Sequence, residues 1–581
     1  MTLLADSLRG LLALCVLGAA SSFCWQAVRR TLVGHSLPLQ IGLTYALSLG
    51  IFTNLLAWVG FWRIHPSLTV LLLGLGWIIS RRLTAHLPPA PAIAWRAQIA
   101  SHSWFWLALG AVLFFPFAHS TYFPFIGDDT LSRYALASRQ LIQAGSLYGY
   151  WLDGYPLHIS FAYLIPLQFA PNVEQIAKLV AFGYALAMLA CTYGLAVRWM
   201  RPQAGAWAVL ALVISPLFLY WAAFEYVDIP TGVYFVLSAY FLHEWRTQPS
   251  PQNALWVGIL LGLGIWSKQA GFAALISAGL VGLGWLISEK LTLARWKMAL
   301  WSGGWILVGA LLFGGWWYVR NAVWLGWQGA IPSPGSYYAS LAQPTLAQVY
   351  PFLKNFNPFG IPTSIFVSLG GLVLLRQNWR KTHWQNWLEL LAWIAPYQYL
   401  WWTGFSYDVR FLLTILPFWL VFASDFWSRL GEQFFTKMSV RWLLAGLTLA
   451  LGAWGVWESR LGGILRWWRD PLASYATRIT IAKGPLYPTA QYILENIPTR
   501  ARLYAMDGRL AYFLADYSVA YGYPRYEQLQ GQYDYFVVGS WAESVYPALQ
   551  YPEMLTYLAD PTRLPVVFAS DGNGLSVRQV R

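Results

Sequence analysis

The sequence predicts an all-α polytopic membrane bundle of about 13–14 transmembrane helices, with helices on one membrane surface and a small C-terminal α/β domain. Three observations predict this fold class. The 581-residue chain is 57% hydrophobic and 18% aromatic, with a mean hydropathy of +0.46. Only 11% of its residues are charged, against about 25% in ordinary soluble domains. Long apolar runs recur along most of the chain and stop near residue 470, where the composition becomes polar.

The apolar runs give the transmembrane helices in order. They lie at residues 8–28, 38–61, 66–80, 104–119, 174–197, 205–222, 230–245, 254–266, 270–287, 299–318, 363–376, 386–402, 410–427 and 440–457. Several are shorter than the ~20 residues of a straight span. They predict N-terminal transmembrane helices at 1–103, a transmembrane core at 104–457 with external loops at 120–173 and 319–362, and a C-terminal domain at 470–581.

The basic residues predict the orientation. A net charge of +14 would suggest nucleic acid in a soluble protein, but here the basic residues lie mostly between apolar runs. Alternate loops carry most of them: Arg29, Arg30, Arg81, Arg82, Arg96, Arg198, Arg201, Arg246, Lys290, Arg295, Lys297, Arg376, Arg380, Lys381, Arg429, Lys437 and Arg441. The opposite loops carry fewer: Arg63, Arg133, Arg139, Lys268, Arg320, Lys354 and Arg410. By the positive-inside rule the first set is cytoplasmic. We therefore expect a multi-pass protein of a bacterial inner membrane, with the loop at 120–173 and the C-terminal domain in the periplasm.

Short elements are predicted on this periplasmic side. Leu131 to Ile142 has helical spacing, and the run from Trp151 to Ser160 turns at Asp-Gly and Tyr-Pro before a second short helix. We expect both helices to lie along the membrane surface.

The tail predicts alternating helix and strand. Tyr487 to Asn496 is an amphipathic helix, and Ala501–Ala505, Asp534–Val538 and Pro565–Phe568 are predicted to be short buried strands. This alternation predicts an α/β domain.

The residues best suited to chemistry also lie on the periplasmic side. The carboxylates are Asp128, Asp129, Glu225 and Asp228, and the cations at span ends are Lys268, Arg320 and Arg410. A carboxylate can take the proton from an acceptor hydroxyl as it attacks a sugar anomeric carbon. Cations can stabilise the phosphate that leaves on its lipid, and arginine suits this task because its planar fork matches phosphate oxygens.

Simpler roles stand beside these. The two adjacent aspartates could cap the helix that starts near Thr130. Glu225 and Asp228 could be solvated loop residues, Lys268 could extend from a helix end to the interface, and His158 could be the polar group of a helix start. Arg133 and Arg139 are six residues apart, a spacing that does not place them on one helix face. One of them could therefore have a structural role and the other a functional role.

Five motifs together resemble one enzyme class. They are Asp128-Asp129 followed by Arg133-Tyr134-Ala135 and Arg139; Tyr155-Pro156-Leu157; Gly262 to Lys268; Trp317-Tyr318-Val319-Arg320-Asn321; and Arg410-Phe411-Leu412 to Pro417. In this order they resemble the motifs of GT-C class glycosyltransferases that use polyprenyl-phosphate sugars. The branch is that of the protein O-mannosyltransferases and the lipid A aminoarabinose transferase. The resemblance spans residues 104–430.

The resemblance implies an inverting transfer with the lipid phosphate as leaving group. It implies Asp128 as the general base and Asp129 as the group that positions the base or the acceptor, with Lys268, Arg320 and Arg410 holding the donor phosphate. Which aspartate is the base stays open, because the pair lies two residues further from Arg133 than in the aminoarabinose branch and its second member is not glutamate. The substrate-binding candidates are Arg133, Tyr134, Arg139, His158, Glu225 and Asp228.

The implied partners are a polyprenyl-phosphate sugar, a glycan, lipid or protein acceptor, and membrane lipids, without nucleic acid. No cofactor is expected, and a metal is not favoured although paired carboxylates can bind divalent cations. Cys15, Cys24 and Cys191 all lie in apolar runs and imply no disulfide framework. Two other functions stay open: a transporter or lipid flippase, which would place charges near the bilayer midplane, and a non-catalytic assembly subunit.

Overall fold

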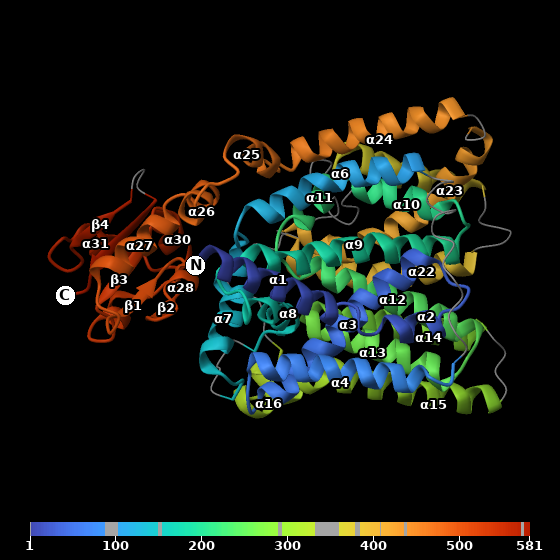
Figure 1. Ribbon diagram of the computed structural model, residues 1–581, viewed down its shortest axis with the longest axis horizontal. Coiled ribbons are helices and arrows are strands. Elements are labelled where there is room, and N and C mark those ends of the chain that lie inside the picture. The colour runs from blue at the N-terminus through green and yellow to red at the C-terminus, as the bar shows by residue number, and fades with distance from the viewer. Residues whose placement is uncertain are drawn as a thin grey trace.

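A computed structural model describes residues 2–87, 103–148, 154–288, 293–331, 359–377, 384–406, 408–434, 438–570 and 574–581. Most of the external loop predicted at 319–362, and Trp151 to Asp153 in the first loop, lie outside these described residues. Some of the basic residues used for the orientation also lie outside them. Five belong to the larger set, Arg96, Lys290, Arg380, Lys381 and Lys437, and one, Lys354, belongs to the opposite set. The described part of the chain is a helical bundle with a small sheet domain at one end (Figure 1).

The first half of the bundle corresponds to the predicted apolar runs. Its helices are α1 (Thr2–Ala20), α2 (Trp25–Thr31), α3 (Leu37–Gly60), α4 (Pro66–Thr84), α6 (Ser103–Tyr122), α7 (Ala135–Ala144), α8 (His158–Leu167), α9 (Glu174–Trp199), α10 (Ala204–Val213), α11 (Pro216–Ala222) and α12 (Asp228–Thr247). The run at 205–222 is broken, because α10 and α11 meet at an angle of 74°. Pro216 begins α11, and a proline is tolerated there because the first helical N–H has no partner in the helix.

The second half continues in the same way. Its helices are α13 (Pro251–Ser267), α14 (Phe272–Ser288), α15 (Leu293–Ala310), α16 (Trp316–Leu325), α17 (Trp327–Ala330), α21 (Ile361–Gln377), α22 (Trp384–Leu400), α23 (Leu416–Phe434) and α24 (Met438–Glu458). Short turns link some of them: the π-helical turns η1 (Thr130–Tyr134), η3 (Leu311–Gly315) and η5 (Trp401–Phe405), and the 3₁₀ turns η2 (Gln269–Gly271) and η6 (Val409–Thr414). Among the described residues, seven helices are long and apolar enough to cross a membrane, or eight if the bent pair α10–α11 is one span.

The centre of the bundle is formed by α12, which is buried along nearly its whole length, packed between α9 and α13. Helix α13 in turn packs closely on α15 and η3. Gly314 makes this approach possible, because a side chain there would overlap the carbonyl oxygen of Gly262. Small residues let apolar helices come this close in a membrane protein. The contact fixes the two helix ends that carry Lys268 and Arg320.

The segment between α6 and α9 differs from its prediction in one respect. The helix predicted at Leu131 to Ile142 is present as η1 and α7, and one face of α7 is exposed. The second helix, α8, was expected on the membrane surface, but every one of its ten residues is buried. Its sequence has no polar face, so it packs inside the bundle against α7 and α9 instead of lying at an interface.

The C-terminal domain contains the predicted sheet. Its helices are α25 (Gly463–Arg469), α26 (Tyr475–Lys483), α27 (Leu486–Asn496), α28 (Leu510–Phe513), α29 (Tyr526–Leu529), α30 (Ala542–Ala548) and α31 (Glu553–Ala559). Its strands are β1 (Arg502–Ala505), β2 (Ser518–Tyr521), β3 (Tyr535–Gly539), β4 (Val566–Ala569) and β5 (Leu575–Gln579), in the order β2-β1-β3-β5-β4. Strand β1 is parallel to β2 and β3, whereas β5 is antiparallel to β3 and β4.

Three of these strands match the predicted ones, and β2 and β5 were not predicted. Strand β4 was expected to be buried, but it is an edge strand whose residues are mostly exposed. The domain lies at one end of the bundle, next to α7 (Figure 1). We call this end the domain end.

Candidate active site

The Asp128–Asp129 pair lies at the domain end, where the loop after α6 enters η1. The N–H of Gly127 donates to the Glu225 carboxylate at 3.0 Å, and the Thr130 hydroxyl donates to the Glu225 carbonyl at 2.6 Å. Residue 127 has to be glycine in this packing, because a Cβ would lie 2.7 Å from the Tyr226 ring and 2.5 Å from the Thr130 hydroxyl. The Asp129 side chain forms no hydrogen bond that caps η1. The pair is therefore held by its backbone, and its carboxylates are available for other contacts.

The Asp129 carboxylate turns toward the bundle and pairs with Arg410. Its Oδ2 lies 2.9 Å from Nη2 of Arg410, and its own N–H donates to the Tyr226 hydroxyl at 3.2 Å. The same guanidinium lies 2.9 Å from Asp408 and over the rings of Tyr226 and Phe411. Arg410 is thus largely enclosed, and only 16% of its side chain is exposed.

Asp228 and Lys268 extend this cluster inward. Lys268 Nζ lies 2.6 Å from Asp228 Oδ1, and Asp228 Oδ2 lies 4.0 Å from Nε of Arg410. Asp228 is only 2% exposed because it begins the buried helix α12. The structure therefore brings together four residues from four distant segments of the sequence: Asp129, Asp228, Lys268 and Arg410.

The cluster around Arg410 contains more carboxylates than cations. Asp129, Asp228 and Asp408 face Arg410 and Lys268. Burial raises the pKa of Asp408, and the neighbouring Arg410 offsets this only in part. Burial is therefore the main cause of the raised pKa, and the nearby Asp228 carboxylate adds a smaller contribution. Within the described residues, no group of three or more His, Cys, Asp or Glu side chains is arranged to hold a metal ion.

The Asp128 carboxylate turns the other way, toward the C-terminal domain. Its Oδ1 accepts from Lys483 Nζ at 2.6 Å and from Arg509 Nη1 at 2.7 Å. The side chain is still 61% exposed. Partial burial raises the pKa of Asp128, but Lys483 and Arg509 outweigh it and hold the pKa below its ordinary value. Asp128 is therefore an accessible carboxylate that stays ionised at neutral pH.

Glu225 and Arg139 have buried structural partners. Glu225 is fully buried and forms an ion pair with Lys178 of α9, and Lys178 also donates to the Pro124 carbonyl at 2.9 Å. Arg139 pairs with the buried Glu174 at 2.8 Å. Both pairs hold the segment that precedes Asp128, because Glu225, Lys178 and Glu174 also form hydrogen bonds with its backbone.

The remaining substrate-binding candidates lie in two places. Arg133 lies over the Tyr155 ring, 4.5 Å from its centre, and Tyr134 is buried beside the same ring. Tyr155 lies within electrostatic range of Lys268, so these residues border the cluster. His158 lies apart from it: the ring is fully buried, 2.7 Å from the Thr53 hydroxyl and 2.7 Å from the Tyr184 hydroxyl.

Arg320 differs from the other two cations because no carboxylate in the described parts of the chain pairs with it. Its guanidinium donates to the Asn321 amide oxygen at 2.8 Å and lies 4.4 Å from the ring centres of Trp317 and Trp324. Asn321 and Trp317 both donate to the Gly154 carbonyl, which joins α16 to the segment between α7 and α8. Arg320 is therefore a half-buried cation beside the loop of Tyr155.

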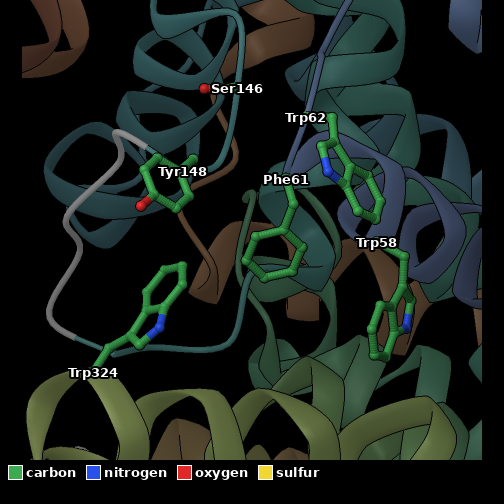
Figure 2. Close-up of a pocket in the computed structure, with 6 residues that line it drawn as sticks. All are labelled: Trp58, Phe61, Trp62, Ser146, Tyr148 and Trp324. Atoms are coloured by element: carbon green, nitrogen blue, oxygen red, sulfur yellow. The ribbon is translucent and has the colours of Figure 1, made fainter.

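An open aromatic pocket of about 640 Å³ lies next to Arg320. It is lined by Trp58, Phe61, Trp62, Ser146, Tyr148 and Trp324. Figure 2 shows the rings of Tyr148, Phe61 and Trp324 around a common space, with 6.1 Å between the ring centres of Tyr148 and Trp324. Trp324 also contacts the Arg320 guanidinium. The pocket thus combines aromatic surface with a nearby cation.

Sequence reasoning did not single out Lys178, Asp408, Lys483, Arg509 or Glu174. Two of them carried a signal, because Glu174 and Lys178 stand in an apolar run, and ionisable residues in a membrane segment point to partners or function. Asp408 stands two residues before Arg410 in a segment already of interest. Lys483 and Arg509 carried none, because nothing in their local sequence distinguishes them from other surface cations.

Comparisons with known proteins identify the fold. No protein-family model matches the sequence, and no curated protein matches it significantly. The crystal structure of ArnT from Cupriavidus metallidurans in the apo state matches with a TM-score of 0.56 and 16% identity, over 83% of this chain and 98% of that one. The same protein bound to undecaprenyl phosphate matches with a TM-score of 0.55 and 15% identity, over 82% of this chain and 98% of that one. The chain therefore has the ArnT-like GT-C fold that the sequence motifs predicted.

Proposed function

We propose that this chain is a membrane glycosyltransferase that moves a sugar from a polyprenyl-phosphate donor to an acceptor on the periplasmic side. One observation carries the proposal: an accessible carboxylate pair lies beside the buried ion-pair cluster that contains Lys268 and Arg410, in a fold that ArnT also has. That ArnT structure was also determined with undecaprenyl phosphate bound, which supports a donor of this lipid class.

The two aspartates take different roles in the proposed reaction. Asp128 is the base, since it is the exposed member of the pair and is ionised at neutral pH. It accepts the proton of the acceptor hydroxyl as the oxygen attacks the anomeric carbon from the face opposite the phosphate, which inverts that carbon. Asp129 positions this segment through its ion pair with Arg410. A carboxylate with a low pKa is adequate because the attacking hydroxyl becomes acidic as its bond to an oxocarbenium-like carbon forms.

The leaving phosphate requires positive charge on the other side of the sugar. Arg320 supplies a guanidinium without a carboxylate partner in the described residues, and the donor phosphate binds it first. Lys268 and Arg410 are already paired with carboxylates, so they act by sharing their remaining N–H donors with the phosphate oxygens. The aromatic pocket beside Arg320 takes the adjoining sugar or prenyl group.

The experiment starts with cells that lack this protein. Mass spectrometry of their membrane lipids should show a polyprenyl-phosphate sugar that accumulates, because its consumer is missing. Purified protein in lipid nanodiscs, added to membranes of these cells, should consume that lipid and release polyprenyl phosphate. The proposal is wrong if no such lipid accumulates and none is consumed. Transbilayer movement of the lipid in liposomes, without acceptor and without its consumption, would indicate a flippase instead.

A further inference from the structure

Two cations of the C-terminal domain reach into the proposed active site. Lys483 at the end of α26 and Arg509 just before α28 both contact Oδ1 of Asp128, at 2.6 and 2.7 Å. They are 355 and 381 residues away from it in the chain. The hydrogen bonds of Asp128 with these two cations all go to Oδ1, and within the described parts of the chain the other oxygen, Oδ2, accepts no hydrogen bond. The contact therefore fixes one oxygen and leaves the other available.

Both cations are held in place by their own domain. Arg509 also forms an ion pair with Asp507 of its own domain, and its Nε lies 2.8 Å from Oδ1 and 3.0 Å from Oδ2 of that aspartate. Lys483 lies in the last turn of α26, where the helix dipole favours a cation. Its side chain is only 13% exposed. Neither cation is a freely moving surface group.

The domain itself is fixed to the bundle through Glu174. This carboxylate is 1% exposed and accepts from Tyr512 at 2.7 Å and Tyr475 at 3.1 Å, both in the C-terminal domain. From the bundle it accepts from the Phe125 N–H and from Arg139, each at 2.8 Å. Tyr475 opens the helix that ends in Lys483, so this junction and the contact with Asp128 lie at the two ends of α26.

We propose that Lys483 and Arg509 are positioning residues of the transferase site, and that the C-terminal domain completes this site by holding the Asp128 carboxylate in its working orientation. This inference rests on the proposed function. The acceptor hydroxyl gives its proton to the free Oδ2 of Asp128 while its oxygen bonds to the anomeric carbon. The bond from that carbon to the donor phosphate breaks, and the electron pair leaves with polyprenyl phosphate. Asp128 then returns the proton to water.

The charges around Asp128 set the sign of the pH dependence. Those that face it or lie next to it are Lys483, Arg509 with Asp507 behind it, Tyr220, Tyr226 and the neighbouring Asp129–Arg410 pair. The two domain cations hold the pKa of Asp128 low. Removing them raises that pKa, so the acid limb of the pH–rate profile moves to higher pH.

The test uses Lys483→Met, Arg509→Met and the double variant in the full-length protein, with the lipid donor obtained from the deletion cells. We expect the double variant to lose kcat by about ten- to a hundredfold, with little change in KM for the donor and with its acid limb at higher pH. Lys483→Arg, which keeps the positive charge, should have the kcat of the wild type and the acid limb of its pH–rate profile at the wild-type pH. Arg502→Met, at an exposed ion pair elsewhere in the domain, is the matched control and should leave both unchanged.

Two results would overturn the inference. One is a double variant with the kcat and acid limb of the wild type while Asp128→Asn is inactive. The other result does not depend on transfer activity. It is that Asp128→Asn and Lys483→Met change the hydrogen-exchange rates of α26 additively in a double-mutant cycle. We expect non-additive effects, because the two side chains are in direct contact. If wild-type protein consumes no donor, the proposed function fails on its own, and the cycle still decides whether Asp128 and the domain are coupled.

Discussion

Replacing Glu174 by glutamine should loosen the C-terminal domain from the bundle. The buried carboxylate accepts four hydrogen bonds, two of them from hydroxyls of the domain. Glutamine keeps the shape but removes the charge that Arg139 pairs with, and it turns an N–H₂ group toward donors. Removing one partner of a buried ion pair costs about 3–5 kcal/mol. Because Arg139 is 30% exposed, we take the low end, about 3 kcal/mol, which is about a hundredfold in the docking equilibrium.

Hydrogen exchange with mass spectrometry measures this equilibrium directly. Peptides from α26 and α28 should exchange up to about a hundredfold faster in Glu174→Gln, while peptides from the centre of the bundle keep their protection. The acid limb of transfer should also move to higher pH, since undocking removes Lys483 and Arg509 from Asp128. Glu495→Gln, an exposed change in α27, is the control. Unchanged exchange in α26 and α28 of the Glu174 variant would refute the assigned role of this carboxylate.

Three further predictions concern the site itself. Gly127→Ala should destabilise the protein by about 1–3 kcal/mol because of overpacking, and it should lower the rate of transfer. Gly110→Ala is the control and should do neither, because a Cβ there meets no atom within 4 Å. Thermal unfolding measures the stability, and donor consumption measures the rate of transfer. Asp228→Asn should lower stability more than the double change Asp228→Asn with Lys268→Met, because the single change leaves a buried cation unpaired; equal melting temperatures would contradict this. Since the pKa of Asp128 is lowered in the folded protein, its contribution to docking is present above its ordinary pKa of 3.8 and is lost as the pH falls through the lowered value. Exchange of the domain helices should therefore accelerate on acidification, and Asp128→Asn should abolish that dependence.

The sequence predicted the parts of the fold that depend on local patterns. Apolar runs place the helices, and the polar tail contains the sheet because its short strands alternate with amphipathic helices. The two exceptions have different causes. Helix α8 is buried because its sequence is apolar on all sides. Strand β4 stays exposed because it lies at the edge of the sheet, a position that its own sequence does not encode.

The site was predictable where motifs carried it. Asp129, Lys268 and Arg410 come from separate motifs and Asp228 from a segment of its own, and the structure places them in one ion-pair cluster. Which carboxylate pairs with which cation was not predictable, because the pairing depends on how α12, η2 and η6 meet in space. The same reason hides the contact between Asp128 and the C-terminal domain. Its cations are ordinary surface residues in sequence, and only the docking of the domain gives them a partner.

The most direct test of the account is the rate at which the lipid donor is consumed by Asp128→Asn and Asp129→Asn in the full-length protein. Asp534→Asn, an exposed aspartate of the C-terminal domain, serves as the matched control. For the Asp128 change we predict a loss of about 10²–10⁴-fold in kcat, the range for removing a general base, with folding and binding of the lipid donor retained. We predict a smaller loss for Asp129→Asn, because it positions the segment through Arg410. Wild-type rates in both folded variants would contradict the assignment of this carboxylate pair to the transfer.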